Sequence, residues 1–165
     1  MPASPDDLFA YLDALGIAHS TVWHEAMFTV EQSSALKADM PGAHTKNLFL
    51  KDKDGQLVLI AAEAHGSIRL NQLHKLIGTA RLSFGAPGLM TEVLGVVPGS
   101  VTAFALMNDK AGRVRFLVDA VLAAAEMVNF HPLVNTGTTA ISQADFRRFV
   151  EATGHGFEVL DFSVL

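Results

Sequence analysis

The chain has 165 residues and a mass of 17.6 kDa, with half of its residues apolar and 18% charged. Chains of this length and composition usually fold around one hydrophobic core, so we expect a single domain over residues 1–165. The absence of cysteine excludes disulfides, zinc–thiolate sites, iron–sulfur clusters and thiol nucleophiles. Seventeen acidic against twelve basic residues give a net charge of −5, which disfavours broad nucleic-acid binding but permits a local basic site.

The first residues lack the basic and then apolar pattern of a secretory signal. No stretch of about 18 apolar residues, the length that would cross a membrane, occurs in the chain. We therefore expect a cytoplasmic protein without a membrane partner.

The first half of the chain contains three strong local signals. Ser4-Pro5 is a typical helix start, and Thr29 with Gln32 three residues later forms a capping box. Asp54-Gly55 supplies the positive φ that a hairpin turn needs. The predicted elements of this half are a helix over 5–15, a strand over 17–24, a helix over 30–39, and hairpin strands over 44–51 and 56–62.

The second half alternates between short helices and apolar, β-branched runs. The predicted elements are helices over 67–77 and 87–94, a hairpin of strands over 100–106 and 113–118, strands over 127–131 and 138–141, and a helix from Ser142 to Gly154. Strands and helices mix without strict βαβ alternation. This order favours a mixed α/β (α+β) domain, in which helices surround a mixed, largely antiparallel sheet.

Three segments could carry chemistry. Lys46 interrupts an apolar strand pattern; it is either a surface lysine that covers the sheet edge or a cation that stabilises a phosphate or a developing oxyanion. The segment over 95–102 contains two glycines and a proline, which suits either an ordinary connection or backbone contact with a ligand. The segment over 129–139 concentrates polar side chains, either to satisfy buried hydrogen bonds or to line a pocket.

Other chemistries find no support in the sequence. The seven histidines form no pair with helical metal-ligand spacing, so we expect no metal. Neither a Gly-x-Ser-x-Gly elbow nor a phosphate-binding or dinucleotide-binding glycine pattern occurs, so we expect no cofactor.

Four ordered segments together resemble the YbaK/ProX family of aminoacyl-tRNA editing domains. They are Thr45-Lys46-Asn47-Leu48-Phe49-Leu50-Lys51-Asp52, Arg81-Leu82-Ser83-Phe84, Leu94-Gly95-Val96-Val97-Pro98-Gly99-Ser100-Val101-Thr102 and Val128-Asn129-Phe130-His131-Pro132-Leu133. The chain looks most like the free-standing prolyl-tRNA editing proteins of that family. The resemblance implies a hydrolase that acts in trans and deacylates Ala-tRNAPro, with tRNA as its partner, prolyl-tRNA synthetase as a transient one, and no DNA.

The resemblance also assigns roles to individual residues. Lys46 matches the family's essential lysine, and Asn47 lies beside it. The substrate-binding residues implied are Asn47, Gly99, Ser100, Val101, Thr102 and His131; cations expected to contact tRNA phosphates are Lys51, Lys75 and Arg81. Position 103 is alanine where the family's glycine-to-proline loop has proline, and Pro98 stands just upstream. An activated ester requires orientation and oxyanion stabilisation rather than a covalent nucleophile, so the lack of cysteine is compatible with this chemistry.

Two other functions within the same fold fit the sequence. A cysteinyl-tRNA deacylase of the YbaK type would share the lysine, and a catalytically silent tRNA-binding module would account for Ala103. A third class, a small-molecule binding protein, would have a pocket without a nearby cationic surface.

Overall fold

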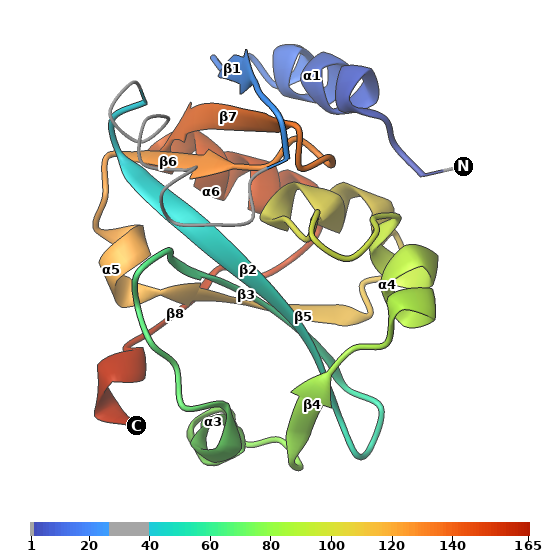
Figure 1. The fold of residues 1–165 in the computed structure, drawn as a ribbon, viewed down its shortest axis with the longest axis vertical. Helices are drawn as coiled ribbons and strands as arrows, with labels where there is room; N and C mark the ends of the chain where they lie inside the picture. Colours follow the sequence, from blue (N-terminus) through green and yellow to red (C-terminus); the bar gives the residue numbers. More distant parts are fainter. Residues whose placement is uncertain (1, 27–39) are drawn as a thin grey trace.

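The computed structural model describes residues 2–26 and 40–165, and its centre is an eight-stranded sheet (Figure 1). The strands are β1 (Ser20–Trp23), β2 (Ala43–Asp52), β3 (Leu57–Glu63), β4 (Leu82–Phe84), β5 (Val114–Asp119), β6 (Met127–Phe130), β7 (Gly137–Ser142) and β8 (Glu158–Leu160). They lie in the order β1-β7-β6-β2-β3-β5-β8, and β4 pairs with β2. Four strand pairs are antiparallel and three are parallel, which confirms the predicted mixed sheet.

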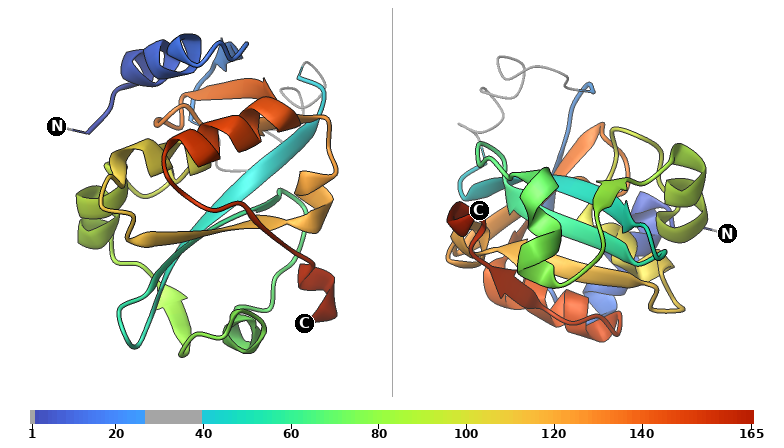
Figure 2. Two further views of the ribbon diagram at one scale, coloured as in Figure 1. Left: turned by 180° about the vertical axis from the view of Figure 1, so that it is seen from behind. Right: turned by 90° about the horizontal axis from the view of Figure 1, so that it is seen from below.

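Helices pack on both faces of this sheet (Figure 2). The α-helices are α1 (Pro5–Ala14), α3 (Leu70–Ile77), α4 (Pro87–Leu94), α5 (Ala120–Ala123) and α6 (Gln143–Ala152), and the 3-10 helices are η1 (Ala103–Asn108) and η2 (Phe162–Val164). Helix α1 begins as the sequence predicts, because Ser4 and Asp7 form a reciprocal capping box. Within the described ranges, no helix is long and apolar enough to cross a membrane.

The hairpin predicted for residues 100–118 is wrong. Residues Ala103–Asn108 form the 3-10 helix η1, which Thr102 caps by accepting a hydrogen bond from the Phe104 N–H. Strand β5 instead pairs in parallel with β3 on one side and β8 on the other. A short apolar run is equally compatible with a strand and with a buried helical turn, so its composition could not decide between them.

Other differences are smaller. The helix predicted from Ser67 begins at Leu70, since Arg69 occupies the N-cap position and no side chain caps that end. The strand predicted over 17–24 is limited to β1, while β4, α5, β8 and η2 were not predicted. The helix predicted over 30–39 lies outside the described residues.

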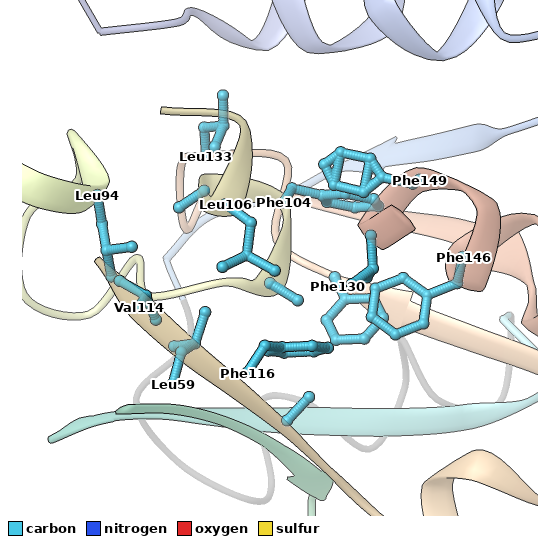
Figure 3. Packing of buried hydrophobic residues seen from close by; sticks show 14 of the residues in the cluster. Leu59, Leu94, Phe104, Leu106, Val114, Phe116, Phe130, Leu133, Phe146 and Phe149 are labelled. Atoms are coloured by element: carbon cyan, nitrogen blue, oxygen red, sulfur yellow. The ribbon is translucent and has the colours of Figure 1, made fainter. Parts of the chain in front are cut away.

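The sheet separates two groups of buried apolar side chains. The larger group contains Phe104, Phe116, Phe130 and Phe146, and the rings of Phe130 and Phe146 stack with centroids 4.6 Å apart (Figure 3). The smaller group lies under α3 and η2 and includes residues of β2, β3 and β5: Leu50, Val58, Ile60, Ala62, Leu73, Ile77, Leu117 and Phe162. The two groups are therefore the cores of the two faces.

Side chains of β2 alternate between these two faces. Phe49 belongs to the larger group and Leu50 to the smaller one, as strand geometry requires. By the same alternation, Lys46 leaves β2 on the face that α3 covers, and its neighbour Asn47 leaves on the opposite face.

A close approach at Gly42 fixes where β2 meets β6. Gly42 has a φ of +106°, and a Cβ atom there would lie 2.7 Å from the Cβ of Met127. Just beyond it, β2 and β6 run parallel, with His44 opposite Asn129. A side chain at position 42 would force these strands apart, so glycine is required at the entrance to the site described next.

Candidate active site

Lys46 lies on β2, opposite Ala62 of β3, and is partly buried. Its Nζ donates a hydrogen bond to the carbonyl oxygen of Gly66, in the loop that follows β3. Among the described residues, no carboxylate forms an ion pair with this ammonium group. A neutral carbonyl orients the lysine without forming an ion pair with it, so Lys46 can attract an anionic substrate group.

A chain of side-chain hydrogen bonds links the site across β2 and β6. Asn47 Nδ2 donates to Thr45 Oγ1 at 3.3 Å, and Thr45 Oγ1 donates to the Asn129 carbonyl at 2.8 Å. The side-chain oxygens of Asn47 and Asn129 are buried and accept no hydrogen bond from the part of the chain that the structure describes. Unsatisfied buried acceptors are rare, and they are suited to a donor from a ligand or water.

His131 immediately follows β6. Its Nδ1 lies 2.9 Å from the Gly137 carbonyl oxygen, which can only accept, so Nδ1 carries the proton. Burial lowers the pKa of His131; the Gly137 hydrogen bond opposes this shift, and the charge of His24 lowers the pKa further. The lowered pKa keeps the ring neutral at pH 7, with Nε2 as a hydrogen-bond acceptor.

His24, at the end of β1, is held next to this histidine. Its Nε2 lies 2.8 Å from Thr138 Oγ1 and its Nδ1 lies 2.7 Å from the Glu25 carbonyl oxygen. Because that carbonyl requires a proton on Nδ1, the Thr138 hydroxyl donates to Nε2 when the ring is neutral. Sequence reasoning selected the segment over 129–139, which includes Asn129 and Thr138, but it did not select His24, because the position of His24 depends on the pairing of β1 with the distant strand β7.

The predicted loop over 99–102 lies beside the segment that carries His131. Gly99 has a φ of +90°, and a Cβ atom there would lie 3.4 Å from Asn135 Nδ2. Ser100 and Thr102 are buried, and the Ser100 N–H donates to the Val97 carbonyl at 3.0 Å. The structure therefore brings Gly99–Thr102 and the His131–Gly137 segment together.

Ala103, where the family pattern has proline, is fully buried at the first position of η1. The Thr102 hydroxyl caps this helix, and Ala103 packs in the larger core. These contacts restrain the loop without a proline ring.

Strand pairing places Lys46 and His131 near one another. Each lies two positions beyond the paired residues His44 and Asn129 on the parallel strands β2 and β6. The hydrogen bond of Lys46, however, is with the loop after β3. Within residues 2–26 and 40–165, no group of three acidic or histidine side chains could hold a metal ion.

The three residues predicted to contact tRNA phosphates lie in two separate places. Lys51 and Arg81 line one hollow between β2 and β4, together with Lys53. Lys75 is exposed on the last turn of α3 and does not line this hollow. Arg81 also lines a neighbouring hollow beside α3.

The fold and site define a mixed α/β domain with a lysine, held by a backbone carbonyl, at a polar strand junction. A family model for the aminoacyl-tRNA editing domain matches residues 24–149, so the chain belongs to the aminoacyl-tRNA editing domain family. Editing domains act on tRNA and are in general deacylases. The resemblance read from the sequence is confirmed.

Several similar proteins carry names that refer to prolyl-tRNA or its synthetase. Prolyl-tRNA synthetase associated domain-containing protein 1 of Mus musculus is 38% identical over 156 residues, which cover 92% of each chain. Prolyl-tRNA editing protein ProX of Acetoanaerobium sticklandii is 30% identical over 155 residues, covering 93% of this chain and 94% of that protein. A solved structure described as a candidate trans-editing enzyme for prolyl-tRNA synthetase has a TM-score of 0.73 at 16% identity, covering 98% and 97% of the two chains. The structural likeness shows the shared fold.

Proposed function

We propose that this chain hydrolyses the ester of alanine wrongly attached to proline tRNA and excludes proline by size. The observation that carries this proposal is the Lys46 ammonium, held by a neutral carbonyl and by no carboxylate among the described residues. Membership of the editing family and the prolyl-tRNA editing protein among its relatives support it.

Each residue of the site has a role in this reaction. Lys46 binds the phosphate of the terminal adenosine or stabilises the negative charge that develops on the ester oxygen. The N–H of Ser100 is already bonded to Val97, so the N–H groups of Gly99, Val101 and Thr102 are the ones that hold the substrate. His131 Nε2 accepts a hydrogen bond from the substrate or from the attacking water. Asn47 leaves β2 on the opposite face from Lys46 and supports the site through its hydrogen bond to Thr45.

Size exclusion is the physical basis of the selectivity. A pocket shaped for proline gains only about 1–3 kcal/mol from a methylene that alanine lacks, so a synthetase cannot strongly reject alanine. A smaller pocket, by contrast, rejects the proline ring by steric overlap. Lys51, Lys75 and Arg81 contact tRNA phosphates, and prolyl-tRNA synthetase is a transient partner.

The test compares hydrolysis of Ala-tRNAPro, Cys-tRNAPro and Pro-tRNAPro by the wild type and Lys46→Ala. We expect rapid loss of the alanyl ester alone, and a decrease of about 10²–10³-fold in kcat for the variant. Lys110→Ala, at an exposed lysine, is the matched control and should retain full activity.

Each contrary outcome has a definite meaning. Faster loss of the cysteinyl ester would identify a cysteinyl-tRNA deacylase. No hydrolysis of any ester would favour a silent tRNA-binding module, and full activity of Lys46→Ala would remove Lys46 from the site.

A further inference from the structure

The loop between β3 and α3 holds the Lys46 ammonium through a backbone carbonyl. Gly66 lies in this loop, and its carbonyl oxygen accepts the hydrogen bond from Lys46 Nζ. A lysine side chain is a flexible stem that gives up rotamer freedom when its ammonium is held in one place. The position of the ammonium therefore depends on how firmly the loop holds Gly66.

Glu63, the last residue of β3, closes the turn that leads to Gly66. Its side-chain Oε2 accepts the His65 N–H at 2.9 Å, and its backbone carbonyl accepts the Gly66 N–H at 3.0 Å. Both acceptors of one residue thus bind the two residues that come just before the Gly66 carbonyl. Without the carboxylate, the His65 N–H would lose its acceptor and the turn would be held by one bond fewer.

Glu63 is in turn fixed by the strands on both sides of β3. It lies opposite Thr45 of β2, and the next residue, Ala64, donates its N–H to the His44 carbonyl at 2.8 Å. On the other side, the Glu63 N–H donates to Asp119 Oδ2 at 3.2 Å. The end of β3 also contacts α5 (Figure 1). The turn therefore starts from a rigid position in the sheet.

Asp119 supports this arrangement from the end of β5. It is 7% exposed, and its Oδ1 accepts the Val121 N–H at 3.1 Å, which caps α5. A Cβ atom at Gly66 would lie 3.3 Å from the Glu63 carbonyl oxygen and 3.7 Å from Asp119 Oδ2. The absence of a side chain at Gly66 lets the loop pack closely against both acidic residues.

Neither acidic residue acts on Lys46 by direct pairing. In the part of the chain that the structure describes, Lys46 forms no ion pair with Glu63 or Asp119. Their connection to the ammonium passes through the backbone of the turn, from the Glu63 carboxylate to the His65 N–H and then to the Gly66 carbonyl.

We propose that Glu63 is a positioning residue for the deacylation reaction: its carboxylate fixes the turn over 63–66, and the Gly66 carbonyl then holds the Lys46 ammonium in place for the substrate. This inference rests on the proposed function, which assigns Lys46 to the substrate. A cation stabilises a phosphate or a developing oxyanion best when it is held in position before the substrate arrives. A displacement of about 1 Å at such a group can cost as much as about 10²-fold in rate.

The first test compares two substitutions of Glu63 in the hydrolysis of Ala-tRNAPro. Glu63→Ala removes the acceptor of the His65 N–H, so we expect kcat/KM to fall at least about tenfold. Glu63→Gln keeps an acceptor oxygen without the charge and should stay within about threefold of the wild type. Glu126→Ala, at an exposed glutamate before β6, is the matched control and should retain full activity. An equal loss in Glu63→Gln and Glu63→Ala would overturn the proposal.

A double-mutant cycle separates positioning from a general structural effect. If Glu63 acts through Lys46, Glu63→Ala should change the residual kcat/KM of Lys46→Ala less than about twofold. Independent effects that multiply in the double variant would overturn the proposal. Urea denaturation of each variant, measured alongside, shows that the proteins compared are folded.

A second measurement detects the position of Lys46 without the reaction. In protein labelled with ¹³C at the lysine Cε, the Lys46 signal is assigned by its absence from Lys46→Arg. A held ammonium gives its two Hε protons different chemical shifts, whereas a mobile side chain averages them. We expect two Hε shifts in the wild type and in Glu63→Gln, and one averaged shift in Glu63→Ala. Two distinct shifts in Glu63→Ala would overturn the proposal.

The outcomes separate this inference from the proposed function. If the wild type hydrolyses no ester but Glu63→Ala averages the two Hε shifts of Lys46, the reaction is wrong and the positioning role stands. If the wild type hydrolyses Ala-tRNAPro, Lys46→Ala is inactive and Glu63→Ala keeps full activity, the reaction stands and the positioning role is overturned.

Discussion

Positive charge is used differently on the α6 and β8 side of the molecule and in the β2–β4 hollow (Figure 2). On the first side, Arg115 lies 2.8 Å from Glu158 and Arg147 lies 3.0 Å from Glu151. In the hollow, Lys51 and Lys53 have no acidic partner among the described residues. Charges with internal partners contribute to folding, whereas charges without them remain available to a ligand. Stability and binding should therefore respond to different substitutions.

The largest loss of stability is expected at a buried pair below α6. Asp109 Oδ2 lies 2.8 Å from His155 Nε2 and also accepts the Val114 N–H, and both side chains of the pair are 2% exposed. Asp109→Ala should lower the free energy of unfolding by about 3–5 kcal/mol, because it leaves buried partners unpaired. Urea denaturation measures this loss. Asp54→Ala, in the exposed hairpin turn, is the control; equal losses in both would contradict the prediction.

A smaller loss is expected at the partly exposed pair of β5 and β8. Arg115 donates two hydrogen bonds to Glu158 and one to the Ile77 carbonyl, so Arg115→Met should cost about 1–2 kcal/mol of unfolding free energy. The hydrogen bonds from Arg115 lower the pKa of Glu158. The pair therefore stabilises the fold fully above about pH 4.5, and this contribution is lost as pH falls through the lowered pKa. Acid titration of unfolding should show that loss in the wild type and not in the variant.

The smallest effect on stability is expected in the hollow. Lys51→Gln and Lys53→Gln should each change the free energy of unfolding by less than about 0.5 kcal/mol, since both side chains are exposed and neither forms an ion pair with the residues that the structure describes. The same variants should weaken tRNA binding. Urea denaturation measures this change. A loss above about 1 kcal/mol would show that these lysines stabilise the fold, as the ion-paired arginines do, and would contradict the prediction.

Local signals in the sequence predicted local structure well. The Ser4 capping box begins α1, Asp54-Gly55 lies in the turn between β2 and β3, and Ser142 caps α6 as expected. The errors concern what a segment pairs with. Strand β5 pairs in parallel with β3 and with β8, and no turn residues near β5 indicate either pairing. Parallel pairing joins segments far apart in sequence, so local residue patterns do not reveal it.

In the candidate site too, residues in local motifs were predicted and residues placed by long-range pairing were not. Lys46, His131 and the loop over 99–102 were selected from short motifs, and the structure places His131 beside that loop through Asn135 and Gly137. His24 was not selected, and neither was Phe84, which lines the hollow between β2 and β4. Their positions depend on the pairings of β1 with β7 and of β4 with β2, which bring together residues at least 30 positions apart.

The length of β2 has a consequence for how such chains can change through insertion and deletion. A single ten-residue strand carries Lys46 near one end and Lys51 near the other, on opposite faces. Deleting one residue between them would turn one lysine to the wrong face, whereas a longer hairpin turn after Asp52 would leave both in place. We therefore expect related chains to differ in the length of that turn while keeping the five-residue interval between the two lysines.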